Sequence, residues 1–215
     1  MKSKVFIIAL FFFIHVNILN ASFCANDFEK VFPTSQTESG SNNLKNGMID
    51  GATLFLQSYA VANMLLSVGE ASDKGYFDLN ASVLHVNEAI SKLEQSKTKY
   101  NDAYKLALSS EYIDLRITQL KSFDYSKYAT ENNLNSEIMS QVSKVLIKGD
   151  VRGFYKQNIE NVDSILSALY SVQNYLNDNQ KPPAESYWAL IRLYSDALLF
   201  GNYATAAARE AFNTL

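Results

Sequence analysis

The spacing of apolar and polar residues predicts helices through most of the chain after residue 45. Residues 52–68, ATLFLQSYAVANMLLSV, contain no charged residue, and their apolar side chains point in every direction when the segment is wound as a helix. A helix that is apolar on all sides is buried on all sides or lies in lipid. Polar residues interrupt this run, which is shorter than the ~20 residues that a membrane span needs. We therefore expect a central buried helix here, and no stable membrane span in the mature chain.

Four further segments repeat apolar residues at helical spacing, and the region before Tyr187 contains the Pro182-Pro183 pair that suits the first turn of a helix. The longest would be a helix of ~60 Å at 1.5 Å per residue, so we expect it to break near Ser109 and Ser110, whose hydroxyls compete for backbone hydrogen bonds. The four segments are residues 82–123, 134–146, 151–176 and 187–200.

An alanine-rich helix over residues 203–212 is expected to end the chain, after a turn at Gly201-Asn202. No convincing alternating strand pattern appears. The sequence therefore predicts an all-α fold, an up-and-down bundle of about five or six helices around a central buried helix. We assign residues 46–215 to this single domain, with Asn46 or Asp50 capping its first helix, and residues 25–45 to a flexible lead-in without apolar period.

The first residues have the layout of a secretory signal peptide. Lys2 and Lys4 precede an apolar segment of about 12 residues, and small residues suited to cleavage follow, before Ser22 or Ala25. We predict that residues 1–24 are a signal peptide and that the protein is exported, to the periplasm or outside the cell. The removal of this segment leaves about 190 residues, enough for one domain with a sizeable core.

Cys24 is the only cysteine of the chain, and its place near the cleavage site raises the alternative of a lipoprotein. Bacterial lipoprotein signals resemble Leu-Ala-Gly-Cys, with a small residue directly before the cysteine. Phe23 stands at that place here, and its bulk disfavours lipidation. One cysteine forms no intrachain disulfide, so we expect the stability of the exported protein to come from core packing.

Charge and residue types exclude several functions. The net charge is −3, and no cluster of Lys and Arg is present to neutralise phosphates, which argues against nucleic-acid binding. Without the signal peptide the chain keeps one histidine, His85, and it lacks a glycine-rich phosphate loop and a Gly-x-Ser-x-Gly motif. Asp196 is the one carboxylate that falls inside the last long apolar segment. We assign no catalytic residue, cofactor or metal ligand, and we expect a protein that is not an enzyme.

The richest local cluster is Tyr187, Trp188 and Arg192. Tyr187 lies on the apolar stripe of its helix, whereas Trp188 and Arg192 lie one turn apart on a neighbouring face, where a guanidinium can stack on the indole. Trp, Tyr and Arg are enriched in binding hot spots. Two interpretations stay open: a contact patch for a partner, and an intramolecular stack that closes the edge of the bundle.

Gln57, Ser58 and Asn63 are polar residues within the uncharged segment. Buried amides and hydroxyls need hydrogen-bond partners. These three side chains could line a small pocket beside the central helix, or they could bond neighbouring helices. The preferred function is therefore an exported, non-enzymatic bundle that acts by protein–protein interaction. The alternative is a sensor-like bundle that binds a small ligand in this polar pocket.

Residues 201–206, GNYATA, resemble the turn between the two helices of a tetratricopeptide repeat, where alanine follows three residues after the aromatic. Ala206 matches that pattern, but Glu210 stands where the next aromatic is expected, and no repeat of about 34 residues relates this turn to the similar KGDV at residues 148–151. The other interpretation is a helix-to-helix turn without family meaning. Both interpretations predict a turn at Gly201.

Overall fold

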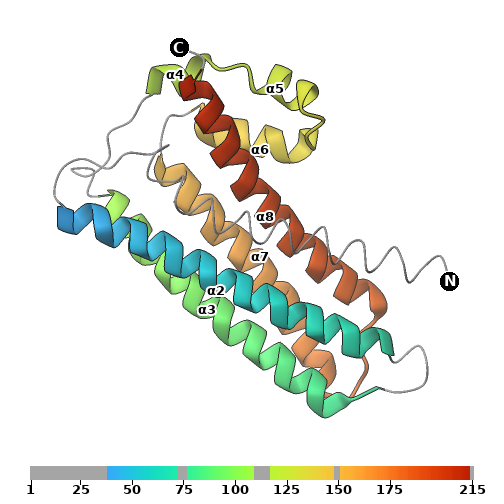
Figure 1. The fold of residues 1–215 in the computed structure, drawn as a ribbon. Coiled ribbons are helices and arrows are strands. Elements are labelled where there is room, and N and C mark those ends of the chain that lie inside the picture. Colours follow the sequence, from blue (N-terminus) through green and yellow to red (C-terminus); the bar gives the residue numbers. More distant parts are fainter. Residues whose placement is uncertain (1–37, 72–76, 109–116, 148–150, 214–215) are drawn as a thin grey trace.

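The computed structural model describes residues 38–71, 77–108, 117–147 and 151–213, and these residues form helices without a strand among them (Figure 1). The predicted all-α class is confirmed, with seven helices in the described ranges instead of five or six. The signal peptide, Cys24 and the site near Ser109 lie outside those ranges. The helices are α2 (Glu38–Ala71), α3 (Leu79–Leu108), α4 (Ile117–Ser122), α5 (Tyr125–Glu131), α6 (Ser136–Leu146), α7 (Val151–Asn177) and α8 (Ala184–Asn213).

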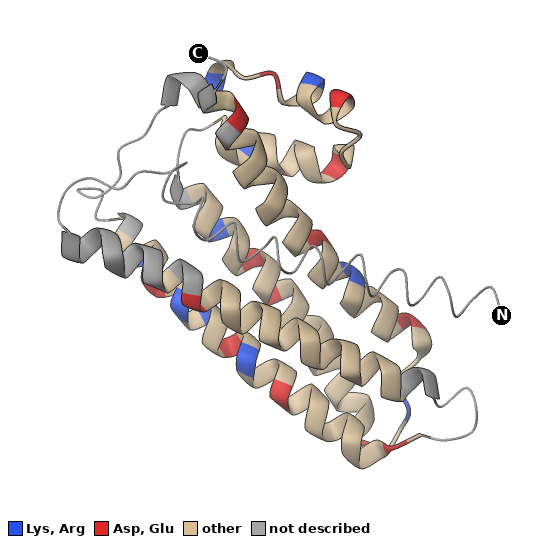
Figure 2. Cartoon of the chain, in the orientation of Figure 1, with Lys and Arg blue, Asp and Glu red and all other residues tan. Residues whose placement is uncertain are grey.

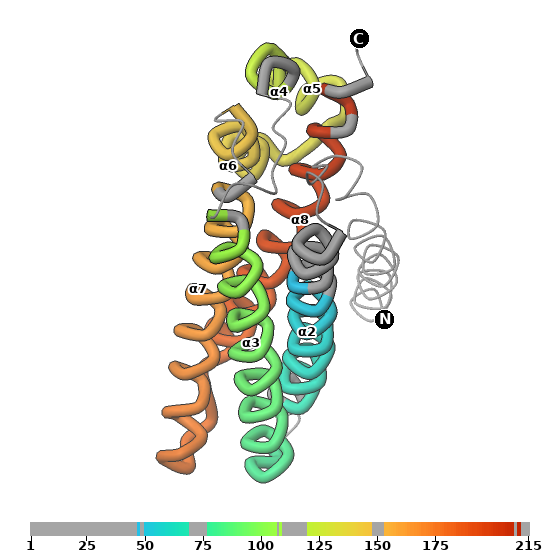
Figure 3. Tube along the Cα trace, turned by 90° about the vertical axis from the view of Figure 1, so that its left-hand side faces the viewer, coloured from blue at the N-terminus to red at the C-terminus, as the bar shows by residue number. Residues whose placement is uncertain are grey.

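Four long helices, α2, α3, α7 and α8, lie side by side as an up-and-down bundle (Figures 1 and 3). Each is antiparallel to the next of the four along the chain, and α2 and α8 close the bundle by contacting each other. The short helices α4, α5 and α6 come between α3 and α7 in sequence and lie at one end, where the last part of α8 contacts α4 and α6.

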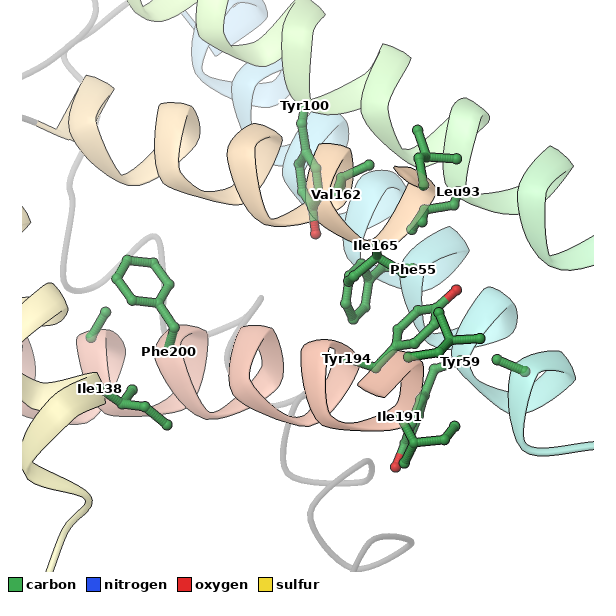
Figure 4. Close-up of a cluster of buried hydrophobic side chains, with 14 of the residues drawn as sticks. Phe55, Tyr59, Leu93, Tyr100, Ile138, Val162, Ile165, Ile191, Tyr194 and Phe200 are labelled. Carbon is green, nitrogen blue, oxygen red and sulfur yellow. The ribbon is translucent and has the colours of Figure 1, made fainter. Parts of the chain in front are cut away.

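The core lies between the four long helices, and each helix contributes the apolar stripe of its helical period. Phe55, Leu93, Ile165 and Tyr194, one from each helix, point into this shared interior (Figure 4). The stripes expected from the sequence are buried in α3, α6, α7 and α8, because a period of 3.6 residues places them on one face.

Helices α2 and α3 approach each other along a line of small residues, which we call the small-residue seam. On α3 these are Ser82, Ala89, Ser96 and Ala103, every seventh residue and all fully buried. Opposite them lies Gly51, where an added Cβ would come 2.6 Å from Cε1 of Tyr100. The Ser96 hydroxyl donates a hydrogen bond of 2.7 Å to the Gly51 carbonyl across the seam. Small side chains therefore allow the two backbones to come close.

The expectation that residues 52–68 are buried on all sides is wrong. One stripe of α2 faces outward, and Met64 on it is 54% exposed. The segment Asp50–Val68 is long and apolar enough to cross a membrane by length and composition, but a helix that contributes to a protein core passes the same test, and 39% of this segment is buried. The remaining members of the outward stripe are small or uncharged polar residues, so the sequence carried no charge to mark the exposed face. They are Thr53, Gln57, Ala60 and Ser67.

Helix α2 also begins earlier than expected. Its first residue is Glu38, so residues 38–45 are helical instead of extended, and the expected caps Asn46 and Asp50 lie within the helix. Residues 38–45 have no apolar period, so the sequence pattern did not indicate a helix there; they extend the helix α2, which packs on α3.

The expected turn at Gly201 is likewise absent, because α8 is continuous from Ala184 to Asn213. The Thr205 hydroxyl donates to the Gly201 carbonyl within this helix at 3.0 Å. Glycine inside a helix costs about 1 kcal/mol, which is small against the burial of the residues on both sides. The buried residues of this part of α8 are Phe200, Ala204, Ala207, Ala208 and Ala211.

Candidate functional site

The three residues predicted to form a contact patch do not share one environment. Tyr187 is 2% exposed, and its buried hydroxyl has no hydrogen-bond partner among the described residues. Burial raises the pKa of Tyr187 to about 12. Tyr187 therefore belongs to the core, as its place on the apolar stripe indicated, and its assignment to a contact patch is wrong.

Trp188 and Arg192 do lie at the surface of α8, and Trp188 is 47% exposed. Arg192 forms an ion pair with Asp196 one turn further on, with 3.7 Å between Nε and Oδ2. Asp196, the carboxylate singled out in the sequence, is thus a paired surface residue. The guanidinium has a carboxylate partner, so Trp188 is the residue of this cluster that can contribute apolar area to a contact.

Gln57, Ser58 and Asn63 do not line a common pocket, so that prediction is wrong. The Ser58 hydroxyl is fully buried, donates to the Ala89 carbonyl at 2.7 Å and accepts from the Tyr194 hydroxyl at 2.5 Å. Asn63 donates to the Tyr59 carbonyl of its own helix at 2.9 Å, and Gln57 faces outward. The other interpretation holds for Ser58, which joins α2 to both α3 and α8.

A tyrosine cluster surrounds Ser58 between α2 and α8. The Tyr194 ring lies 5.3 Å from the rings of both Phe55 and Tyr59. Burial raises the pKa of Tyr194 and, against smaller opposing effects of the nearby Asn63 and Ser195 side chains, that of Tyr59. The Tyr59 hydroxyl is buried without a well-oriented hydrogen-bond partner among the described residues. These hydroxyls stay protonated near neutral pH and belong to a packed core.

His85 is half-buried in α3, and its Nδ1 is a buried atom without a hydrogen-bond partner among the described residues. Glu88, one turn on, is exposed. Within the described ranges no three His, Cys, Asp or Glu side chains gather where they could hold a metal ion. His85 therefore has no neighbouring set of ligands there.

A charged groove that the sequence did not reveal runs between α3 and α7, around a cavity of about 510 Å³. Lys97 forms an ion pair with Asp163 across it, and the Tyr170 hydroxyl donates to Glu94. That hydrogen bond raises the pKa of Tyr170. Both carboxylates are thus engaged in contacts between helices. Glu94, Asp163 and Tyr170 lie off the apolar stripes of their helices, and helical period alone does not tell which of these faces meet.

Each long helix carries an exposed large apolar side chain near the end of the bundle where α2 leads to α3 and α7 leads to α8, and Figure 1 shows this end of the four helices. A hydrogen bond of 2.7 Å from Gln173 to Asn87 confirms that the end of α7 lies beside the start of α3. We call this group the apolar end; it consists of Met64, Leu84, Tyr175 and Trp188, one residue from each long helix.

Few charges accompany the apolar end on α2 and α3. Residues 51–68 of α2 and residues 79–87 of α3 contain no Lys, Arg, Asp or Glu, and both segments appear tan in Figure 2. The sequence singled out Trp188 alone. Met64 and Leu84 could have been found as large apolar residues off the core stripe, but their shared location needed the packing of the helices.

No family model, curated protein or solved structure was found to match this chain.

Proposed function

We propose that this protein is an exported, non-enzymatic helical bundle that acts by binding another protein through its apolar end. The observation that carries the proposal is the position of Met64, Leu84, Tyr175 and Trp188, one exposed large apolar side chain on each long helix, near the same end of the bundle. Single exposed apolar residues are common on soluble proteins, whereas grouped ones mark interaction sites.

The residue types also favour a protein partner. Aromatic residues and methionine are enriched in protein interfaces, and tryptophan and tyrosine dominate their hot spots. Trp188 is exposed by nearly half, so a partner that covers it removes a large apolar surface from water. The residues are distributed around the bundle end, and a partner that encloses this end, instead of touching one side, would contact most of them.

Export and the non-enzymatic role have separate support. The basic start and apolar segment of residues 1–16 are typical of a secretory signal. The buried hydroxyl of Ser58 bonds α3 and α8, and at the surface Asp163 and Glu94 bond partners across the α3–α7 groove, so these polar groups serve contacts between helices.

Site-specific photo-cross-linking in the source cells tests the proposal. A photo-reactive amino acid replaces Trp188 in one variant and Leu108 in the matched control, because these side chains are 47% and 50% exposed and lie at opposite ends of the bundle. We expect a discrete cross-linked protein from position 188 and none from position 108. The recovered chain should begin at Ser22 or Ala25, as export predicts.

Equal cross-linking from both positions, or none from position 188, would contradict binding at the apolar end. As a second measurement, Trp188→Ala should weaken binding of the identified partner by about 2 kcal/mol or more, the usual threshold of a hot spot. A cross-linked chain that still begins at Met1 would contradict export.

A further inference from the structure

Besides the groove between α3 and α7, a second hollow lies between the short helices α5 and α6. These helices are at the end of the molecule opposite the apolar end (Figure 1). The volume of the hollow is about 580 Å³, within the ~300–1,000 Å³ of small-molecule sites. Among the residues that the structure describes, no charged side chain lines it. Its lining combines the buried apolar surfaces of Tyr125, Ala129 and Met139 with hydroxyl groups at the rim, among them Thr130, Ser140 and Ser143.

The two helices that form this hollow are held by their own caps. At the start of α5, Asp124 accepts a hydrogen bond of 2.9 Å from the Lys127 amide. At the start of α6, Asn135 accepts from the amides of Glu137 and Ile138 at 3.0 and 3.1 Å. Each cap stabilises its helix by about 1 kcal/mol.

The turn between them is equally defined. Asn133 has a φ of 52°, in the left-handed region that asparagine tolerates best after glycine. The Leu134 amide donates to the Ala129 carbonyl at 2.9 Å, which closes the end of α5. The walls of the hollow are therefore set before any ligand arrives, as is usual in small-molecule sites.

The hydroxyls at the rim restrict what can bind. The Thr130 hydroxyl donates to the Ser126 carbonyl, and the Ser143 hydroxyl donates to the Ser140 carbonyl, both at 3.0 Å. A hydroxyl has one hydrogen and two lone pairs, so these two offer only acceptors to a ligand. A ligand that contacts these two hydroxyls must then bring its own donors, whereas Ser140 and Asn133, which also line the hollow, carry both donors and acceptors. A charged ligand would find no opposite charge in the lining to offset its desolvation.

We propose that this hollow binds a neutral, polyhydroxylated ligand, such as a sugar ring. A sugar ring has an apolar face for the Tyr125–Ala129–Met139 floor and hydroxyl donors for the rim. The site is independent of the apolar end, because the two lie at opposite ends of the molecule (Figure 1).

Saturation-transfer NMR on the full mature chain tests this site with glucose, N-acetylglucosamine, maltose and maltohexaose at millimolar concentration. At least one sugar should receive saturation from the protein. Binding of maltose or of maltohexaose supports the proposal equally. The ratio of the two affinities distinguishes a free sugar from the end of a longer glycan as the ligand. Glucose 6-phosphate should bind at least tenfold more weakly than glucose.

Two threonines provide a matched pair of variants. Thr130 and Thr98 are both exposed, and each hydroxyl donates to the carbonyl four residues earlier at 3.0 Å. Thr130→Val should weaken sugar binding by at least threefold, and Ser140→Phe, which fills the hollow, should abolish it; Thr98→Val should leave it unchanged. No transfer to any sugar, tighter binding of the phosphate, or equal effects of the two valine variants would overturn the proposal.

Discussion

Gly51 and Gly201 are both helical glycines, yet their surroundings are opposite. A Cβ at Gly51 would lie 2.6 and 2.7 Å from two atoms of the buried Tyr100 ring, whereas a Cβ at Gly201 would meet nothing within 4 Å. Gly51 is thus required by the close approach of α2 and α3. Gly201 lies inside a helix and carries the conformational cost of glycine there. No described side chain comes close enough to require a glycine at this position.

Alanine substitutions at the two positions should therefore have opposite effects. Gly51→Ala should lower the free energy of unfolding by about 1–3 kcal/mol, because the Tyr100 ring must move within a packed core. Gly201→Ala should raise it by about 0.5–1 kcal/mol through helix propensity. Urea unfolding followed by circular dichroism measures both. Effects of the same sign would contradict the close contact between Gly51 of α2 and the Tyr100 ring of α3.

Among the helices, α2 and α3 show what the apolar period does and does not tell. The stripe of Val86, Ile90, Leu93 and Tyr100 is predictable, because large apolar side chains recur at helical spacing and are buried. The small-residue seam on the adjacent face was missed, since serine and alanine have weak hydropathy. The recurrence of a small residue at every seventh position was nevertheless present in the sequence and could have been recognised.

The seam predicts how its alanines respond to enlargement. Ala89→Leu should destabilise the protein by about 1–3 kcal/mol or more, because Ala89 is fully buried and its carbonyl accepts from Ser58 across the seam. Ala60→Leu is the matched control: Ala60 is on the outward stripe of α2, and the change should stay within about 0.5 kcal/mol. Thermal unfolding midpoints of the two variants compare them. Similar midpoints would contradict the close packing of α2 on α3.

At the scale of the whole molecule, buried tyrosines are distributed over several helices. Burial raises the pKa values of Tyr100, Tyr125, Tyr155 and Tyr194 above 10.0, and that of Tyr187 to about 12. The unfolded chain ionises its tyrosines near pH 10, whereas the folded chain retains these protons to higher pH. Their contribution to stability is therefore complete below pH 10 and is lost as pH rises from 10 toward the folded-state pKa.

Alkaline unfolding tests this linkage. Each such tyrosine should reduce the free energy of unfolding by about 1.4 kcal/mol per pH unit between pH 10 and its folded-state pKa. Urea midpoints at pH 9, 10 and 11 should be followed together with phenolate absorbance at 295 nm, in which the contribution of these buried tyrosines should appear with unfolding. In Tyr187→Phe the decline between pH 10 and 12 should be shallower. An unchanged slope in that variant would contradict the burial of Tyr187.

The all-helical class, the apolar stripes and most helix positions were determined by the sequence itself, because helical period is a local property of residues three and four apart. Only the tertiary structure decided that α2 exposes a stripe, that α8 continues through Gly201, and that Met64, Leu84 and Trp188 all lie near one end of the bundle. Whether a residue is buried depends on which helices pack against it. Threonine, glutamine, serine, alanine and glycine are tolerated both in a core and at a surface. Where such uncharged residues dominate, the sequence pattern does not predict which helix face is buried, and the packing of the helices decides it.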